Sequence, residues 1–280
     1  MRPLILALWL AASPLAHAQS KPNEPTPEQD RASLVKAIQK SFPGVPVTEW
    51  SLAGITLKPG VAVSPLGGAH ATNINDILAI GKKQWERKFK NGKSLAACFP
   101  AGGRRAATAY PQFDARQAAI ITLEMAVSQC LHANAEDSFD PLRMGAVIAH
   151  VRSLAINDRL NLRALASAAD SAARAHYQNG RQWFTRRLGE RDLACASCHV
   201  LQAGKIIDGA AVAPAVGMVL AWPRVEPGGS IRSLQRQFQL CMTRVGAEPF
   251  MLQSPSFNDL EFFLSMVANG LVVRPAIATQ

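Results

Sequence analysis

Apolar residues recur at helical spacing in most of the segments of this chain, with polar residues between the stripes. The pattern predicts helices over residues 31–38, 75–89, 114–130, 140–156, 164–187, 230–243 and 256–270. Asp114, Asp140 and Ser230 are the expected N-caps, and Gly270 is expected to end the last helix. Aromatic residues are few and alanine is abundant, so the predicted fold class is mainly α.

The remaining segments are rich in proline and glycine. Residues 42–60 are predicted to be extended chain and turns, and residues 157–159 a linker between two halves. Pro214, Gly217 and Trp222-Pro223 lie in a loop that follows the second half's most specific motif.

That motif is Cys195-Ala196-Ser197-Cys198-His199, the attachment sequence of c-type haem. Two thiols must reach one edge of the porphyrin, and the adjacent histidine must bind the iron from below. A zinc site would need a second Cys/His pair at ligand spacing, and a redox dithiol would need a βαβ context. Neither is present in the pattern, so one covalently bound haem c is predicted, with His199 as an axial ligand.

The first eighteen residues have the features of a secretory signal. Arg2 supplies the charge, residues 4–12 form an apolar run too short to span a membrane, and Ala16-His17-Ala18 is a cleavage site. We therefore expect export to the periplasm, cleavage near Ala18, a leader over residues 19–45, and no membrane span.

The charge and length narrow the class of partner. The 280 residues carry a net charge of +10, which suits an acidic protein partner or an anionic substrate. Nucleic acid is a poor fit, because the basic residues are scattered and the protein is expected to be exported. About 260 mature residues are enough for one large domain or two ordinary ones.

The five cysteines divide unevenly. Cys195 and Cys198 are assigned to haem, and Cys98 and Cys130 are expected to form a disulfide in an oxidising compartment. Cys241 is left over. Its open interpretations are a reactive thiol, an intermolecular bridge, a metal ligand or a buried inert thiol.

The ligand above the iron decides the function. Electron-carrier cytochromes use a methionine some forty to sixty residues after the motif, which makes Met242 and Met251 candidates; Met266 lies slightly beyond and Met218 lies in the loop. Cys241, 42 residues after His199, falls in the same window. A cysteine ligand donates more electron density and lowers the reduction potential.

At this point several stretches resemble the SoxA family, the catalytic cytochrome subunit of sulfur-oxidising SoxAX complexes. They run in the family's order: Ala109–Asp114, Thr122–Glu124, Cys130, Leu193–Val200, Ala203-Gly204, Arg236–Cys241, Ala247–Phe250 and Asn258–Phe263. The resemblance covers about residues 75–275.

The resemblance implies two cytochrome c-like helical domains in tandem. We place the first at 46–157 and the second at 158–280, with haem only in the second. The first half echoes the order of elements in the second, but Cys98 lacks both a cysteine three residues on and a following histidine. The alternative is an unrelated helical first half.

The resemblance also implies an activity and partners. Cys241 maps to a haem ligand carried as a persulfide, and the activity is that of an L-cysteine S-thiosulfotransferase. Thiosulfate is conjugated oxidatively to a cysteine of the carrier SoxYZ, and electrons leave through the small cytochrome SoxX. A simple periplasmic electron carrier with a methionine ligand, and a degenerate scaffolding haem subunit, are the competing functions.

One position departs from the family. Related proteins have an arginine, thought to bind substrate, where this chain has Gln237. Either a neighbouring arginine, Arg236 or Arg244, replaces it, or the substrate differs. Arg244 shares the helical face of Cys241, whereas Arg236 points away from it.

Overall fold

The computed structural model describes residues 24–52, 71–165, 170–207, 210–226 and 230–274, and these are mainly helical, as predicted. The helices are α1 (Pro27–Ile38), α2 (Ala71–Glu86), α3 (Leu95–Cys98), α4 (Arg104–Ala109), α5 (Leu123–Ala133), α6 (Pro141–Ser153), α7 (Ser171–Thr185), α8 (Cys195–His199), α9 (Leu234–Arg244) and α10 (Pro255–Val267). The expected signal segment lies outside the described residues. Within those residues, no helix has both the length and the apolar character that crossing a membrane requires.

Short antiparallel strand pairs connect some of the helices. They are β1 (Gln112–Asp114) with β2 (Ala119–Ile121), β3 (Ile206–Ile207) with β4 (Ala210–Ala211), and β5 (Arg224–Val225) with β6 (Ile231–Arg232). Four 3₁₀ helices are also described: Gln39–Ser41, Val47–Leu52, Pro100–Gly103 and Met218–Ala221. The one at Val47–Leu52 falls in a segment predicted to be extended. Its continuation over 53–60 lies outside the described residues.

Side-chain caps fix where the longer helices begin. Asp140 accepts a hydrogen bond from the amide of Arg143 at 2.9 Å, which confirms the predicted start of α6. Ser233 caps α9 and Ser254 caps α10 in the same way, whereas Ser230 was expected to cap the first of these helices and residue 256 to begin the second. In both cases a neighbouring serine offered the same capping chemistry, and the sequence alone did not separate them.

Asp114 was expected to cap a long helix, and that prediction is wrong. Its Oδ1 instead accepts hydrogen bonds from the amides of Arg116 at 2.8 Å and Gln117 at 3.2 Å, so it closes the turn of the β1–β2 hairpin. Helix α5 begins only after Thr122, whose hydroxyl accepts from the amide of Met125. An aspartate side chain can accept hydrogen bonds from nearby backbone amides either as a helix N-cap or in a hairpin turn. The tertiary contacts of the segment decide which of the two forms.

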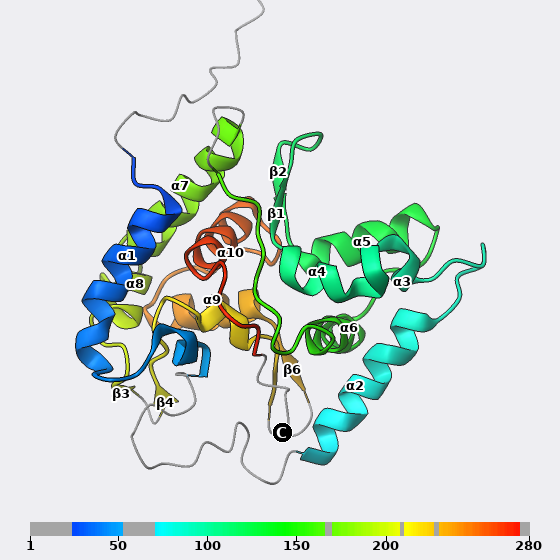
Figure 1. Cartoon of the computed structure of the whole chain (residues 1–280), viewed down its shortest axis with the longest axis horizontal. Coiled ribbons are helices and arrows are strands. Elements are labelled where there is room, and N and C mark those ends of the chain that lie inside the picture. The colour runs from blue at the N-terminus through cyan, green and yellow to red at the C-terminus, as the bar shows by residue number, and fades with distance from the viewer. Residues whose placement is uncertain (1–23, 53–70, 166–169, 208–209, 227–229, 275–280) are drawn as a thin grey trace, which may run out of the picture.

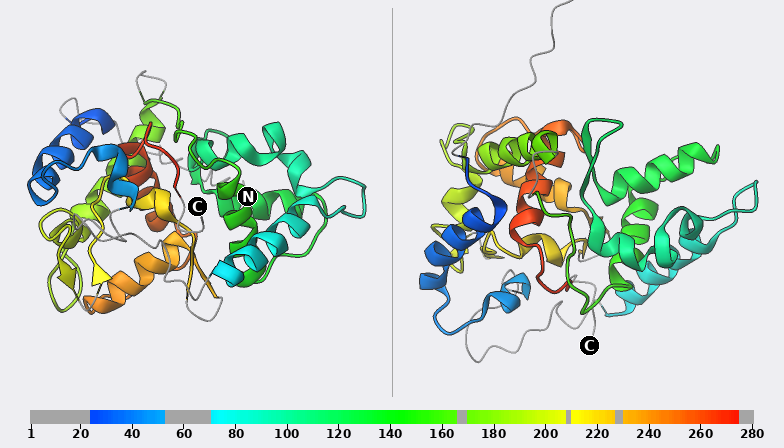
Figure 2. Two further views of the ribbon diagram at one scale, coloured as in Figure 1. Left: turned by 60° about the horizontal axis from the view of Figure 1, so that its bottom comes forward. Right: turned by 45° about the horizontal axis from the view of Figure 1, so that its top comes forward.

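The helices form two groups, each around its own core (Figure 1). The first group, α2 to α6, encloses a cluster of apolar side chains that includes Trp85, Leu95, Val127 and Val147. The second group, α7 to α10, encloses a larger cluster that includes Phe184, Phe238, Phe257 and Phe263. Both views of Figure 2 keep the groups side by side, with the hairpin and the C-terminal chain between them.

A glycine sets the closest helix crossing in each group. A Cβ on Gly81 of α2 would lie 2.0 Å from the carbonyl oxygen of Ala146 in α6. A Cβ on Gly180 of α7 would lie 1.9 Å from the carbonyl oxygen of Asp259 in α10. Both helix pairs therefore pack backbone to backbone, at a distance that only glycine allows.

The first described segment packs on the second group (Figure 1). Asp30 of α1 accepts hydrogen bonds from Tyr177 at 2.8 Å and Arg181 at 3.0 Å, both on α7. Phe42 and Trp50 follow α1 and belong to the second group's core. Part of the segment predicted to be a leader is therefore built into the fold.

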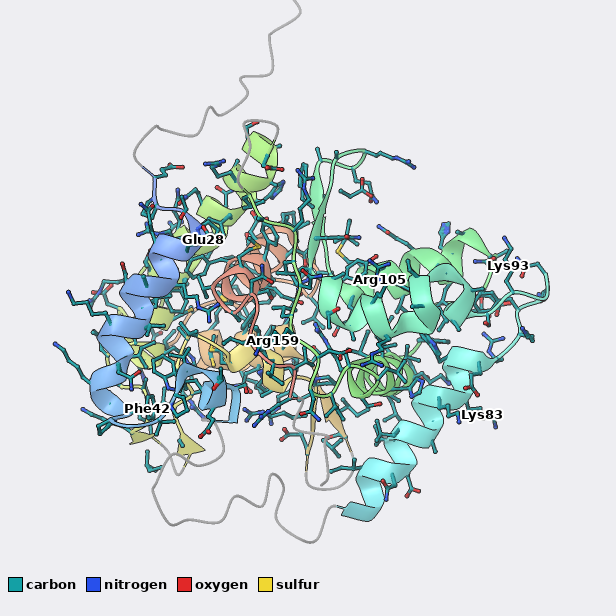
Figure 3. All side chains as sticks on the ribbon, in the orientation of Figure 1. Glu28, Phe42, Lys83, Lys93, Arg105 and Arg159 are labelled. Atoms are coloured by element: carbon teal, nitrogen blue, oxygen red, sulfur yellow. A yellow bond between two sulfur atoms is a disulfide. The ribbon has the colours of Figure 1, made fainter. Side chains whose placement is uncertain are left out.

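The predicted linker is held on both sides. Asp158 forms an ion pair with Arg104 of α4 at 2.7 Å, and its carbonyl accepts from the amide of Val273. Arg159 donates to the carbonyl of Gly270 at 2.9 Å and lies between the two groups (Figure 3). The linker is thus a fixed part of the junction.

A buried polar network also joins the groups. Gln253 donates to Glu124 of α5 at 2.5 Å, and its amide donates to Gln235 of α9 at 2.6 Å. Gln235 in turn donates to Glu261 of α10 at 3.0 Å. Burial, reinforced by the negative charge of Glu261, raises the pKa of Glu124 to about 7, against the partial compensation of Gln253 and Arg152.

Candidate functional site

Helix α8 presents the two cysteines of the motif. Cys195 and Cys198 are three residues apart on one helical turn, so their thiols share a face. The turn begins where the amide of Ala194 donates to the hydroxyl of Ser197 at 3.1 Å. Because α8 packs against α7, this face is held at the edge of the second core.

The hydrogen bond of His199 leaves one ring nitrogen available. Its Nδ1 lies 2.8 Å from the carbonyl oxygen of Ala213, so Nδ1 carries the proton and donates it. The lone pair of Nε2 is then available to bind a metal. Burial lowers the pKa of His199, which keeps the imidazole neutral as iron ligation requires.

Cys241 comes from α9 and lies near the motif. Burial raises the pKa of Cys195 to about 12, and negative charge on Cys241 and Cys198 adds to this shift. Burial likewise raises the pKa of Cys241, with Cys198 contributing in the same direction. The three thiols therefore lie within electrostatic reach of one another, and all three are unpaired.

The disulfide prediction is confirmed. Cys98 at the end of α3 is bonded to Cys130 of α5, with Cα atoms 6.2 Å apart. Asn134 donates to the carbonyl of Cys130 at 2.7 Å and holds the end of α5 beside the bond. The pairing leaves Cys241 as the one cysteine outside the disulfide and the motif.

A chain of hydrogen bonds leads to the sulfur of Cys241. Gln237, one helical turn earlier, donates from Nε2 to Sγ at 3.3 Å. Arg232 of β6 donates from Nη1 to Oε1 of Gln237 at 2.9 Å, and from Nη2 to Glu226 at 2.6 Å. The charges of Arg244 and Arg232 both act to lower the pKa of Cys241 against its burial.

The structure separates the three candidate substrate residues. Gln237 contacts Cys241, and Arg244 lies within electrostatic reach of it. Arg236 points elsewhere and donates to Gln239 at 2.7 Å. The sequence did not indicate Arg232, because it precedes α9 on a strand and helical periodicity does not apply to it. If Ser233 had been identified as the N-cap of α9, Arg232 would have been placed immediately before the cap.

The candidate methionine ligands lie in two settings. Met218, Met242 and Met266 are buried in the second core. Met251 is 79% exposed in the segment after α9. The first three contribute to packing of the second core, and Cys241 is a further sulfur that interacts electrostatically with the motif thiols.

These residues fit the haem that the motif requires. Two thiols share one turn, a neutral imidazole offers Nε2, and a third sulfur from a different helix lies close by. Val200, Ala213 and Phe250 supply apolar surface around them as part of the second cluster.

A family model described as the SoxA/TsdA cytochrome c domain matches residues 80–168. That range contains most of the first group of helices and precedes the Cys-x-x-Cys-His motif. The chain therefore contains a cytochrome c domain, which implies haem c.

The chain is also similar to curated proteins. It is 34% identical over 194 residues to the L-cysteine S-thiosulfotransferase subunit SoxA of Chlorobaculum tepidum, covering 68% of this chain and 66% of that protein, just under two thirds of its length. It is 27% identical over 248 residues to the subunit of the same name from Allochromatium vinosum, covering 88% of each.

Among solved structures, the crystal structure of SoxXA from P. pantotrophus superposes with a TM-score of 0.62 at 21% identity. The match covers 72% of this chain and 76% of that one. At this identity the likeness shows the fold.

Proposed function

The chain belongs to the SoxA family, and from that premise we propose that it is an L-cysteine S-thiosulfotransferase subunit that works through Cys241. The observation that carries the proposal is the position of Cys241. This cysteine is left unpaired, lies within electrostatic reach of the two motif thiols, and accepts a hydrogen bond from Gln237.

The proposed site holds one haem c. Cys195 and Cys198 would attach it covalently, and Nε2 of His199 and the sulfur of Cys241 would be the ligands of its iron. When bound, the haem supplies a ferric iron that stabilises a thiolate and accepts electrons. Ala213 holds the imidazole in the tautomer that this role needs.

The proposed reaction is an oxidative conjugation. The sulfur of Cys241 forms an S–S bond with the outer sulfur of thiosulfate, with loss of two electrons. The thiolate of a carrier cysteine then attacks that outer sulfur, the new S–S bond forms on the carrier, and the Cys241 thiolate leaves. Overall, one thiol proton and two electrons are released, and the electrons pass in single steps to a partner cytochrome.

We assign the partners by family membership. The small cytochrome is of the SoxX type, forming a heterodimer, and the carrier is SoxYZ. The matched crystal structure is titled SoxXA, and the net charge of +10 suits an anionic substrate and an acidic carrier. Residues 1–18 would direct the chain to the periplasm, where c-type haem is attached.

We further propose that the two helix groups are tandem cytochrome c-like domains that meet at about residues 157–158, with residues 27–52 packed on the second domain and not, as expected, in part on the first. The paired glycine crossings support this division. Cys98 follows Gly81 by 17 residues and Cys198 follows Gly180 by 18. In this alignment Leu95 and Phe99 stand where the motif has Cys195 and His199, so the first domain would carry no haem.

The test is replacement of Cys241 by alanine. The ferric spectrum should change, any extra sulfur mass on the residue should disappear, and thiosulfate-dependent turnover should stop. The haem should stay attached through Cys195 and Cys198, which separates loss of function from loss of the cofactor.

Replacing Cys241 with methionine is the matched variant. It should keep a low-spin haem without restoring turnover, because a thioether binds iron but cannot form the S–S bond with thiosulfate that the proposed reaction needs. An alanine variant with an unaltered spectrum and full activity would exclude Cys241 as ligand and carrier. A methionine-ligated electron carrier would then be the better proposal.

A further inference from the structure

We propose that Arg232 is the residue that binds the anionic end of the substrate at Cys241, and that Gln237 holds its guanidinium toward the sulfur. The inference rests on the proposed function for the identity of the anion, since thiosulfate is the substrate assigned there. Arg232 lies outside α9. The helical pattern and the family resemblance had both placed the candidate substrate-binding residues on that helix.

The backbone of Arg232 is fixed before the helix begins. Strand β6 pairs with β5 so that Arg232 lies opposite Arg224, and the amide of Glu226 donates to the carbonyl of Ser230 at 2.8 Å. Ser233, the next residue, caps α9. Arg232 therefore enters the site from a short, hydrogen-bonded ribbon whose end is tied to the helix that carries Cys241.

The amide of Gln237 can bridge in only one sense. A guanidinium has donors and no acceptor, so Oε1 must face Arg232 and Nε2 is left to face the sulfur. Gln237 thus joins the cation to Cys241 through one side chain. Among the described residues, Gln237 and Glu226 accept two of the five N–H donors of Arg232, which leaves three donors for another acceptor.

The local charge favours an anion. Two guanidiniums, Arg224 and Arg232, face each other across the ribbon, and Glu226 is the carboxylate that interacts with both. The buried Nε of Arg224 has no hydrogen-bond partner, and its guanidinium stacks on Trp222 at 4.5 Å. One carboxylate between two cations leaves a net positive charge beside Cys241.

The chemistry matches a divalent oxyanion with a sulfur at one end. A guanidinium binds sulfonate-type oxygens through parallel N–H donors, as it binds carboxylate or phosphate. With the oxygens on Arg232, the outer sulfur of thiosulfate is directed at the sulfur of Cys241. Arg244, whose charge also reaches Cys241, adds to the attraction.

The experiment compares Arg232→Gln and Arg232→Lys with wild type as haem-loaded protein. A hydrogen bond between charged groups is worth about 1.5–3 kcal/mol, so Arg232→Gln should raise KM for thiosulfate about tenfold or more. The haem should stay attached through Cys195 and Cys198, so that loss of the cofactor does not explain the change in KM. Arg232→Lys should recover part of the affinity, because it keeps the charge without the fork. A KM within twofold of wild type for Arg232→Gln would overturn the proposal.

The matched control is Arg143→Gln. Arg143 pairs with Asp140 on α6 of the first group, so this variant loses the same charge without touching the ribbon. Its KM should equal that of wild type. An equal rise in both variants would show an effect of net charge and would overturn the assignment to Arg232.

Equilibrium binding of thiosulfate, measured calorimetrically without carrier protein, separates this proposal from the function on which it rests. If wild type binds thiosulfate and Arg232→Gln does not, the anion site stands even where no sulfur transfer occurs. If wild type transfers sulfur and Arg232→Gln binds and reacts equally well, the function stands and the role of Arg232 is refuted.

Discussion

Glu124 carries a carboxyl group whose charged form is disfavoured by burial in the folded protein. Burial and the charge of Glu261 raise its pKa from 4.5 to about 7. Between these two values the folded protein binds a proton that the unfolded chain has released. The free energy of unfolding therefore falls as the pH rises through this window, and it stays low above pH 7.

Replacing Glu124 with glutamine should remove that loss. The amide keeps an oxygen for Gln253 and carries no charge, so the variant should be more stable than wild type at pH 8, by up to about 3 kcal/mol. Urea denaturation at pH 5 to 8 measures the difference, and the variant should show the flatter dependence on pH.

Glu136→Gln is the control for that experiment. Its hydrogen bond with Arg87 lowers the pKa of Glu136, so it is already ionised throughout pH 5 to 8 and contributes no slope there. The control should follow wild type. The same slope in wild type and Glu124→Gln would mean that Glu124 is charged in the folded protein.

At the scale of single residues, some pairings could be predicted from the sequence, whereas others depend on tertiary contacts that the sequence does not show. The pairing of Cys98 with Cys130 followed from counting cysteines in a chain expected to be exported. Glu124 and Gln253 are 129 positions apart, and no local pattern connects them. Arg232 was not predicted for a related reason. It lies on a strand and its partner Gln237 lies on the helix that follows, so neither strand nor helix periodicity relates the two residues.

At the scale of helices, the two glycine crossings can be tested by adding one methyl group to each. In a helix, Gly→Ala normally stabilises by about 1 kcal/mol. Here the added Cβ of Gly81→Ala or Gly180→Ala would overlap a backbone oxygen. Each variant should therefore unfold more easily, by about 1–3 kcal/mol, as measured by denaturant midpoint.

The two variants should differ in their effect on the cofactor. Gly81→Ala lies in the first group and should leave the haem spectrum unchanged, whereas Gly180→Ala loosens α7, on which α8 packs. An increase in stability for either variant would show that its helices can separate without cost.

Helix prediction succeeded where one capping residue was available and failed where local chemistry was ambiguous. The pair Asp140-Pro141 indicates the start of a helix and nothing else, and α6 begins there. Asp114 can cap a helix or close a hairpin turn, and the packing of β2 against α7 and α10 favours the hairpin. Gly81 and Gly180 lie within segments predicted to be helical, and only the crossings explain why these two positions are glycine.

At the scale of the whole molecule, the mass of the purified native protein is the broadest check. We expect a chain cleaved near Ala18, one haem and one disulfide. Acid-acetone extraction should leave the haem on the protein, because thioether bonds hold it. Two haems per chain would contradict the assignment of the first group as haem-free.

The sequence predicted two halves and the place where they meet, but it did not predict how closely they are joined. Residues 27–52 come first in the chain and pack with the second core. This arrangement depends on Asp30 meeting Tyr177 across 147 positions. Apolar periodicity says which face of α1 is buried and does not say which partner buries it.

The glycine crossings have a consequence for how such a chain can evolve. Gly81 and Gly180 hold their helix pairs together without using any residue that binds a cofactor. In the proposed duplication, an ancestral cysteine and histidine at positions 95 and 99 could therefore have been replaced by the apolar core residues Leu95 and Phe99 while the first half kept its shape. A mutation at Gly81 would meet purifying selection at once. Among descendants of a common ancestor, we expect the glycines to outlast the haem ligands.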